Sequence, residues 1–228
     1  METDFKIYPA TLDPKDYWGQ VKRTVNGLPV SEAQIEMIVL AIDNGLALAE
    51  HGDDRMLDIG CGNGALSSLL FRKLSSFLGI DFSEYLISVA KRDFEKLPDF
   101  QFKVEDAISY VLSESDPLNF NKVLCYGCFS YFHEAENLLR ILHDRFTNVE
   151  RIFIGNLPDR DRAHLFYRDG LPLSDELNNS DSKIGIWRTE AEFNKLARSA
   201  NWTCQFVKMS DSFYASHYRY DVILTRGI

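Results

Sequence analysis

Three glycines at alternate positions, Gly60, Gly62 and Gly64, constrain the fold of this chain more than any other feature. Residues 56–59 before them read as a short buried strand, and residues 65–74 after them have the apolar spacing of a helix. Glycine lacks a Cβ, so such a turn can adopt positive φ and let a ligand lie against the backbone. The pattern predicts a strand, a turn and a helix whose free amides favour an anion; the alternative is a tight turn without a ligand.

Two acidic residues discriminate between the ligands that use such a turn. A dinucleotide-binding turn places its glycines against a pyrophosphate, and residues 60–65 can be fitted to that spacing. Asp58, however, stands two residues before Gly60, where its carboxylate would repel a pyrophosphate and attract an ammonium. Asp81 follows Gly60 by about 20 residues, the offset at which an acid at the end of the next strand binds ribose hydroxyls.

The stretch from Met56 to Gly64, which reads MLDIGCGNG, resembles motif I of class I (Rossmann-like) S-adenosylmethionine (SAM)-dependent methyltransferases of small-molecule type. This resemblance implies SAM as the cofactor and S-adenosylhomocysteine (SAH) as its product. It also implies an acid that binds adenine after the third strand; Asp106 matches that position and fits a helix N-cap equally well. The cofactor-binding residues that we expect are Asp58, Gly60, Cys61, Gly62, Asp81, Phe82, Asp106, Ala107 and Tyr126.

Strand-like and helix-like segments alternate along the chain. Strands are expected at 56–59, 76–81, 100–105, 122–127, 151–156, 204–209 and 220–226. Helices are expected at 32–48, 84–97 and 107–112, then in segments ending at 146 and 200. Capping boxes are expected at Ser31 with Gln34 and at Thr189 with Glu192, and Ser83 fits an N-cap. This order predicts an α/β fold: a doubly wound, mostly parallel sheet of about seven strands, with a C-terminal antiparallel hairpin and helices on both faces.

The chain divides into two expected regions. Residues 1–50 are expected to form an N-terminal helical cap or lid, and residues 51–228 the SAM-binding methyltransferase domain. Residues 157–188 are too long for an ordinary connection, so we expect an insertion that covers the substrate site. A short helix is expected at 16–23, whose aromatic residues can pack on the core, close over the ligand, or do both.

Composition limits the partners and the location of the protein. A net charge of −9 argues against nucleic acids and anionic membranes as partners. No apolar run approaches the ~20 residues of a membrane span, and residues 1–4 lack the features of a signal peptide. The four cysteines do not have the spacing of a disulfide framework, so we expect a reduced, cytoplasmic setting. The oligomeric state stays open.

Methyl transfer requires a group that accepts the proton of the nucleophile and side chains that align it. Because histidine takes up protons near neutral pH, His217 and His133 are the candidate bases, ahead of His164, with Tyr214 as a further catalytic candidate. The candidate substrate-binding residues are Tyr17, Trp18, Tyr131, Arg160, His164, Tyr167 and Arg219, with Arg162 and Arg168 as further cations for a phosphate or carboxylate. His51 and His143 are expected at a helix end and on a helix face.

No metal site is expected. Cys125 and Cys128 lack a second pair of ligands, and the acids of residues 159–161 lack a clear third ligand. Residues 127–132 also lack the Asp/Asn-Pro-Pro-Tyr signature of amino-methylating nucleic-acid enzymes.

We therefore expect SAM-dependent O-methylation of a small polar acceptor with a histidine base. A phosphorylated or nucleotide-linked sugar of surface polysaccharide biosynthesis is one acceptor class. The alternatives are N-methylation of a small molecule or a protein, and a non-catalytic SAM-binding protein; a dehydrogenase is more distant.

Overall fold

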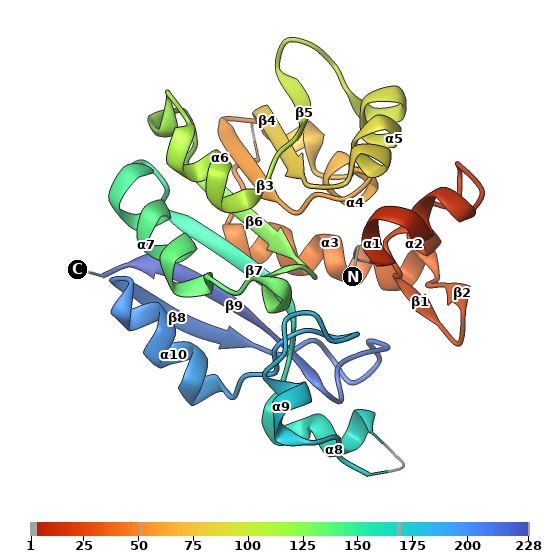
Figure 1. Cartoon of the computed structure of the whole chain (residues 1–228). Helices are drawn as coiled ribbons and strands as arrows, with labels where there is room; N and C mark the ends of the chain where they lie inside the picture. Colours follow the sequence, from red (N-terminus) through yellow and green to blue (C-terminus); the bar gives the residue numbers. More distant parts are fainter. Residues whose placement is uncertain (1–3, 51, 168–169, 228) are drawn as a thin grey trace.

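The computed structural model describes residues 4–50, 52–167 and 170–227, so His51 and Arg168 lie outside the described residues. Its centre is a seven-stranded sheet with the strand order β5-β4-β3-β6-β7-β9-β8 (Figure 1). The strands are β3 (Asp54–Ile59), β4 (Leu74–Asp81), β5 (Phe100–Val104), β6 (Lys122–Tyr126), β7 (Arg151–Pro158), β8 (Trp202–Val207) and β9 (Arg219–Arg226). A separate small hairpin is formed by β1 (Thr24–Val25) and β2 (Leu28–Pro29).

The direction of the strands confirms the expected fold. β3 is parallel to β4 and β6, β4 is parallel to β5, and β6 is parallel to β7. β9 pairs antiparallel with both of its neighbours, β7 and β8, so it is the reversed strand of the C-terminal hairpin. The carboxyl ends of the parallel strands therefore meet at one edge, where α/β sheets bind their ligands.

Helices cover both faces of the sheet (Figure 1). One face carries α3 (Glu32–Leu46), α4 (Ala65–Ser68) and α5 (Glu84–Phe94), and the other carries α6 (Ala107–Ser113), α7 (Ala135–Arg145) and α10 (Glu190–Ser199). Two short helices precede α3, namely α1 (Asp4–Ile7) and α2 (Tyr17–Gln20), and two more lie between β7 and α10, namely α8 (Ala163–Phe166) and α9 (Ser174–Leu177). Single 3-10 turns are η1 (Tyr8–Thr11), η2 (Phe71–Lys73), η3 (Pro117–Asn119), η4 (Phe129–Tyr131) and η5 (Arg160–Arg162).

The segment after the glycine turn differs from the helix that was expected over 65–74. It forms one α-helical turn, α4, and the separate 3-10 turn η2, after which β4 begins at once. The Ser68 hydroxyl donates to the Ala65 carbonyl at 2.8 Å, and the Ser67 hydroxyl donates to Asp58, so both serines favour a break in the helix. A four-residue helix has a weak dipole, and the charge at this turn comes from side chains instead.

Of the two expected capping boxes, the one at Thr189 and Glu192 is present, and the one at Ser31 is wrong. Ser31 precedes α3 but makes no side-chain capping bond. Gln34 instead accepts a hydrogen bond from the Tyr214 amide at 2.8 Å, because α3 packs beside the connection between β8 and β9. The Gln34 side chain therefore bonds to a distant segment and not to the N-terminus of its own helix.

The other expected elements are present, with small changes in their ends. The Ser83 hydroxyl caps α5, which ends at Phe94 because Glu95 is extended and Lys96 pairs with Phe100 at the start of β5. β8 begins at the buried Trp202. α3 shares its apolar core with the sheet through Ile38 and Ile42, and the division of the chain near residue 50 stays a prediction. Within the described ranges, no helix combines the length and apolarity that crossing a membrane demands.

Candidate functional site

The glycine turn joins the carboxyl end of β3 to α4 and is held against β4. The amides of Gly60 and Cys61 both donate to the Ile80 carbonyl, at 2.8 and 3.0 Å. Gly60, Gly62 and Gly64 have φ values of +75°, +58° and +74°, which lie in the left-handed region that favours glycine. The backbone conformation thus explains the alternating glycines, and it brings the turn to the end of β4.

Asp81, the last residue of β4, faces this turn. Its Oδ2 accepts a hydrogen bond from the Gly62 amide at 3.0 Å, and its Oδ1 accepts one from the Ser83 amide at 2.9 Å. Burial raises the pKa of Asp81, and these two amides lower it. A carboxylate oxygen can accept two hydrogen bonds, so each oxygen retains acceptor capacity for a ligand hydroxyl. Asp81 therefore fits the ribose of SAM.

Asp58 lies on the other side of the turn, with only 3% of its surface exposed. Its Oδ2 accepts a hydrogen bond from the Ser67 hydroxyl. Burial raises the pKa of Asp58 to about 7; the Ser67 hydroxyl lowers it, the charge of Asp81 raises it, and the charge of Arg23 lowers it. A buried carboxylate without a strong cationic partner suits the ammonium group of SAM.

Arg23 is a site residue that the sequence reasoning missed. Its guanidinium carbon lies 5.3 Å from the ring centroid of Trp18 and 5.2 Å from that of Tyr126. Its charge reaches both Asp58 and Tyr126, and it can hold the carboxylate of SAM. The signal in the sequence was the pair of basic residues 22–23 after an aromatic pair, which has no specificity by itself.

The N-terminal segment lies directly on the glycine turn. The buried Asn63 donates through Nδ2 to the Tyr17 carbonyl at 2.8 Å and to Gln20 Oε1 at 2.9 Å. The Tyr17 hydroxyl donates to Asp93 of α5 at 3.0 Å, and its ring lies 5.3 Å from that of Phe94. Tyr17 thus packs on α5 while its backbone is bonded to the turn, and Trp18 is the member of the aromatic pair beside Arg23.

The residues expected around adenine follow β4 and β5. The Glu105 amide donates to the Asp81 carbonyl at 3.0 Å, which brings the two strand ends together. Asp106 accepts the Ser109 amide at 2.9 Å, so it is the N-cap of α6. Phe82 is 43% exposed directly after Asp81. The cap leaves one oxygen of Asp106 available, and the adenine role stays a prediction.

The charge of Arg219, the first residue of β9, acts on residues of β6, η4, β9 and the connection between β8 and β9. Burial raises the pKa of each of Tyr126, Tyr131, Tyr214 and Asp221, and the positive charge of Arg219 lowers all four. The Arg219 guanidinium also donates to the Asn156 carbonyl. Three tyrosines that were expected at the site therefore lie near the charge of Arg219, which was expected there too. Asp221, which the sequence reasoning missed, also lies near this charge.

The three candidate histidines lie at separate, exposed positions. The side chain of His133 is 70% exposed and bonds to the Ser180 hydroxyl, with its Nε2 3.9 Å from Asp181. His164 is exposed on α8, and His217 is exposed with its ring 4.8 Å from that of Tyr218. Their roles stay predictions. The expected helix-face residue His143 pairs with Asp144 on α7 at 2.9 Å.

Arg160 and Tyr167 take part in the packing of the insertion. The Arg160 guanidinium donates to Glu192 of α10 and to the Trp187 carbonyl, both at 2.7 Å. The Tyr167 ring lies 4.9 Å from that of Phe166 and 5.6 Å from that of Trp187. These contacts tie the insertion to α10, and neither residue has a contact that points to a substrate.

Of the three cysteines near the turn, Cys125 is buried, and Cys61 and Cys128 are half-buried. Cys125 and Cys128 have their sulfur atoms 3.1 Å apart, and the Cys128 thiol donates to the Ile59 carbonyl at 3.0 Å. Hydrogen bonding to Cys125 and burial raise the pKa of Cys128, and burial raises that of Cys61. Across the described ranges, His, Cys, Asp and Glu side chains form no group of three that could hold a metal ion.

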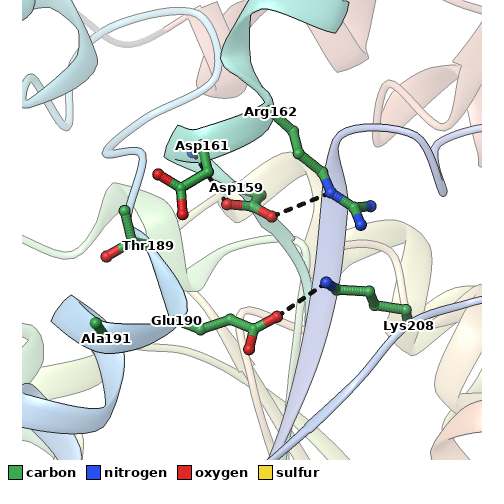
Figure 2. Close-up of a pocket in the computed structure, with 7 residues that line it drawn as sticks. All are labelled: Asp159, Asp161, Arg162, Thr189, Glu190, Ala191 and Lys208. Atoms are coloured by element: carbon green, nitrogen blue, oxygen red, sulfur yellow. Dashed lines mark hydrogen bonds and ion pairs between the residues drawn. The ribbon is translucent and has the colours of Figure 1, made fainter.

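A hollow of about 700 Å³ lies between the end of β7 and the start of α10 (Figure 2). Four of its five charged residues form two ion pairs: Asp159 Oδ2 lies 3.5 Å from Arg162, and Glu190 Oε1 lies 3.1 Å from Lys208. The hollow contains none of the residues around the glycine turn. It is therefore a surface depression beside the insertion and separate from the candidate site.

Comparison with known proteins identifies the family. Residues 50–214 match the family described as "Methyltransferase domain", which is more than half of the chain. The chain therefore belongs to the class I, Rossmann-like SAM-dependent methyltransferases, as the glycine motif predicts, and SAM is the cofactor of that family.

The curated relatives match only part of the chain. The ubiquinone biosynthesis O-methyltransferase of Pseudomonas aeruginosa (strain LESB58) is 25% identical over 118 residues, which cover 49% of this chain and 48% of that protein. The corresponding protein of Pseudomonas entomophila (strain L48) is 24% identical over 125 residues, or 54% and 52% of the two chains. The chain thus spans about half the length of the curated relatives it matches.

Two solved structures illustrate the fold. Magnesium protoporphyrin IX methyltransferase (ChlM) from Synechocystis PCC 6803 with bound SAH has a TM-score of 0.67 at 17% identity, over 98% of this chain and 97% of that one. The [4+2]-cyclase SpnF has a TM-score of 0.64 at 14% identity, over 84% and 81%. Because a protein described as a cyclase shares this architecture, the fold alone does not specify the reaction.

Proposed function

We propose that the protein transfers a methyl group from SAM to a hydroxyl of a small polar acceptor. The observation that carries this proposal is the pair of buried carboxylates, Asp58 and Asp81, on either side of the glycine turn. Negative charge at both positions disfavours a pyrophosphate and favours an ammonium beside a ribose. Membership of the methyltransferase family supports the same reading.

Each of three charged residues beside the turn has a distinct proposed task. Asp81 accepts the ribose hydroxyls, Asp58 accepts the ammonium, and Arg23 holds the carboxylate of the amino-acid part of SAM. Bound SAM supplies an activated methyl group on a sulfonium. The protein then has to align the acceptor oxygen with that methyl group, keep competing water away and accept one proton.

Several features support an oxygen acceptor. The similar curated proteins are named as O-methyltransferases, although the match covers about half of their length. The residues around Arg219 are mostly tyrosines, whose rings can hold a small molecule and whose hydroxyls can hydrogen-bond it. A base is essential for a hydroxyl and less so for an amine, because an amine is already nucleophilic.

The candidate bases, the acceptor class and the location complete the proposal. His217 and His133 are the candidate bases, and both side chains are exposed to solvent. Arg219 is the cation at the site that could bind a phosphorylated or nucleotide-linked sugar. The net charge of −9 supports a small-molecule acceptor over nucleic acid or an anionic membrane, and we propose a cytoplasmic location for the protein.

Calorimetric titration with SAM, SAH and NADH tests the cofactor first. We expect SAM and SAH to bind and NADH not to bind, and we expect Asp81→Ala to lose at least tenfold in affinity for SAM. Asp116→Ala, which changes an exposed aspartate after α6, is the matched control and should bind as wild type does. Binding of NADH in place of SAM would refute the cofactor assignment.

A panel of sugars, sugar phosphates, phenols and amines then tests the acceptor, with SAH release as the measure of turnover. Methylation of a hydroxyl compound supports the proposal. Methylation of amines alone favours the N-methyltransferase alternative, and SAM binding without any turnover favours the non-catalytic one.

A further inference from the structure

Two buried oxygen atoms beside Arg219 lack a partner. Asp221 Oδ2 and Asn156 Oδ1 are both shielded from solvent, and in the part of the chain that the structure describes neither accepts a hydrogen bond. Asp221 is only 3% exposed. Leaving a buried carboxylate oxygen unpaired costs free energy, so such a group calls for a specific explanation.

A β-bulge creates this arrangement. Ile154 pairs with Val222 and Leu157 pairs with Tyr220, so two residues of β7 stand opposite the single residue Asp221 of β9. One of the two, Asn156, has φ of +65°, and its amide donates to Asp221 Oδ1 at 2.7 Å. Bulges of this kind redirect side chains, and they are frequent beside active sites.

A single strand, β6, separates the bulge in β7 from β3, which leads into the glycine turn. Gly155 of the bulge accepts a hydrogen bond from the Gly127 amide at 3.0 Å, directly after the end of β6. A Cβ on Gly155 would overlap the ring of Tyr126, so that ring packs closely over the bulge. β6 is in turn the neighbour of β3, which carries Asp58 and the glycine turn. Asp221 therefore lies at the edge of the sheet formed by the carboxyl ends of the parallel strands, the same edge that carries the proposed cofactor site.

We propose that Asp221 accepts the hydrogen bond and then the proton of the acceptor hydroxyl, with Asn156 Oδ1 as the second oxygen that holds the acceptor. This inference rests on the proposed function and replaces the histidines as the base. The ligand class is a small molecule whose reacting hydroxyl donates a hydrogen bond into the bulge.

The step balances as an in-line displacement. The acceptor O–H bond breaks and its proton passes to Asp221 Oδ2. The acceptor oxygen forms the new bond to the methyl carbon, and the carbon–sulfur bond of the donor breaks with its electron pair remaining on sulfur. The products are the methyl ether, the neutral thioether SAH and the protonated carboxyl group, which returns its proton to solvent.

The surroundings of Asp221 suit a base that works near neutral pH. Burial raises the pKa of Asp221 to about 6, while the Asn156 amide and the charge of Arg219 lower it. Tyr126 of β6, which is separated from β9 by β7, is a titratable group whose pKa is raised by burial and by the charge of Asp221. The carboxylate is thus ionised at pH 7.5 and more basic than an exposed aspartate, which improves proton transfer from a hydroxyl. Because Asp221 is only 3% exposed, side chains that bury it must move when the acceptor binds.

Asp221→Asn is the test variant, because it keeps the size and the acceptor for the Asn156 amide but cannot take a proton. Asp54→Asn is the matched control: Asp54 is a buried aspartate at the opposite end of β3, and both of its oxygens are bonded, to the Ala49 amide and to Asn121. Thermal unfolding, SAM calorimetry and SAH release are measured for wild type and both variants.

The melting arm needs no acceptor. We expect Asp221→Asn to raise the melting temperature at pH 8 by roughly 5 °C, because it removes an unpaired buried charge, and we expect this gain to shrink towards pH 5. Asp54→Asn should lower it. If Asp221→Asn melts below wild type at pH 8, then Oδ2 supports the fold and the proposal is overturned.

The activity arm uses the hydroxyl compound that wild type methylates fastest. Asp221→Asn should lose ~10²-fold or more in kcat/KM while it binds SAM within about twofold of wild type, and wild-type kcat/KM should fall below pH 6. Activity within about threefold of wild type would overturn the proposal and leave the proposed function intact. If wild type binds SAM but methylates no hydroxyl compound, the proposed function fails instead, and the proposal fails with it.

Discussion

Binding of SAM should depend on pH through Asp58. Burial raises the pKa of this carboxyl group to about 7, so the group is about half ionised at pH 7.0 and about 3% ionised at pH 5.5. If the ammonium of SAM binds the carboxylate form, the affinity should fall about 15-fold between these two pH values, which corresponds to ~1.6 kcal/mol. Both values lie below the ordinary pKa of an α-amino group, about 7.7–8.0, so the ligand stays largely charged.

Calorimetry in two buffers of different ionisation enthalpy measures both the affinity and the protons released. At pH 5.5, close to one proton should leave the protein for each SAM bound. Asp58→Asn should bind weakly and without this pH dependence. Ser67→Ala removes the hydroxyl that lowers the pKa of Asp58, so it should move the midpoint of the pH dependence upward.

The same group affects stability with a defined sign. Folding raises the pKa of Asp58 from 3.8 to about 7, so the folded state binds the proton more tightly than the unfolded state. Its contribution to stability is complete below about pH 3.8 and is lost as the pH rises to 7, by up to about 4 kcal/mol. Asp58→Asn should therefore unfold at a higher temperature than wild type at pH 8. An affinity for SAM that is constant from pH 5.5 to 7.0 would refute this account of Asp58.

Three further predictions concern the turn and its surroundings. Gly60→Ala should lower the free energy of unfolding by about 1–3 kcal/mol, because the new Cβ would stand 2.5 Å from Cys128 Sγ at a φ of +75°. The control is Gly27→Ala, which has a similar φ of +80° but no atom within 4 Å of the new Cβ, and it should cost less. Equal losses in denaturant melts would contradict the contact argument. Asn63→Ala removes the bonds that tie α2 to the turn, so amide hydrogens of that segment should exchange faster, and unchanged exchange would show that the segment is held elsewhere. Thr189→Ala breaks the capping box of α10 and should destabilise the protein by about 1 kcal/mol without altering SAM affinity; calorimetry and melting curves check both parts.

Local signals in the sequence account for much of the fold. The alternating glycines and the Thr189 capping box act between residues close in the chain, and the structure confirms the positive φ of the glycines and the bonds of the cap. The antiparallel hairpin was also predictable, because the short connection between its strands leaves no room for a crossover helix. Local signals failed at two places: a contact with the distant Tyr214 amide replaces the capping bond of Gln34, and the hydroxyls of Ser67 and Ser68 form bonds that break the helix expected over 65–74.

The proposed acceptor site has a different origin. Asp221 and Asn156 are 65 positions apart, and their relation depends on a bulge in the register of β7 against β9. Arg23 reaches the site from the N-terminal segment by stacking near Tyr126, and no spacing rule links these two residues. The candidate bases His133, His164 and His217 were chosen for their positions after strand ends, and burial could not be judged from that pattern. The structure places all three at exposed positions.

The sequence by itself therefore determined the cofactor class, because a glycine turn, an acid beside it and a second acid at the end of the next strand are encoded within one strand-turn-helix-strand unit. The alternation of strands and helices determined the fold class in the same way. Only the tertiary structure decided which groups surround the proposed acceptor position. Burial, charge proximity and the unpaired oxygen of Asp221 all arise from strand register and from packing between distant segments, and these properties have no local pattern in the chain.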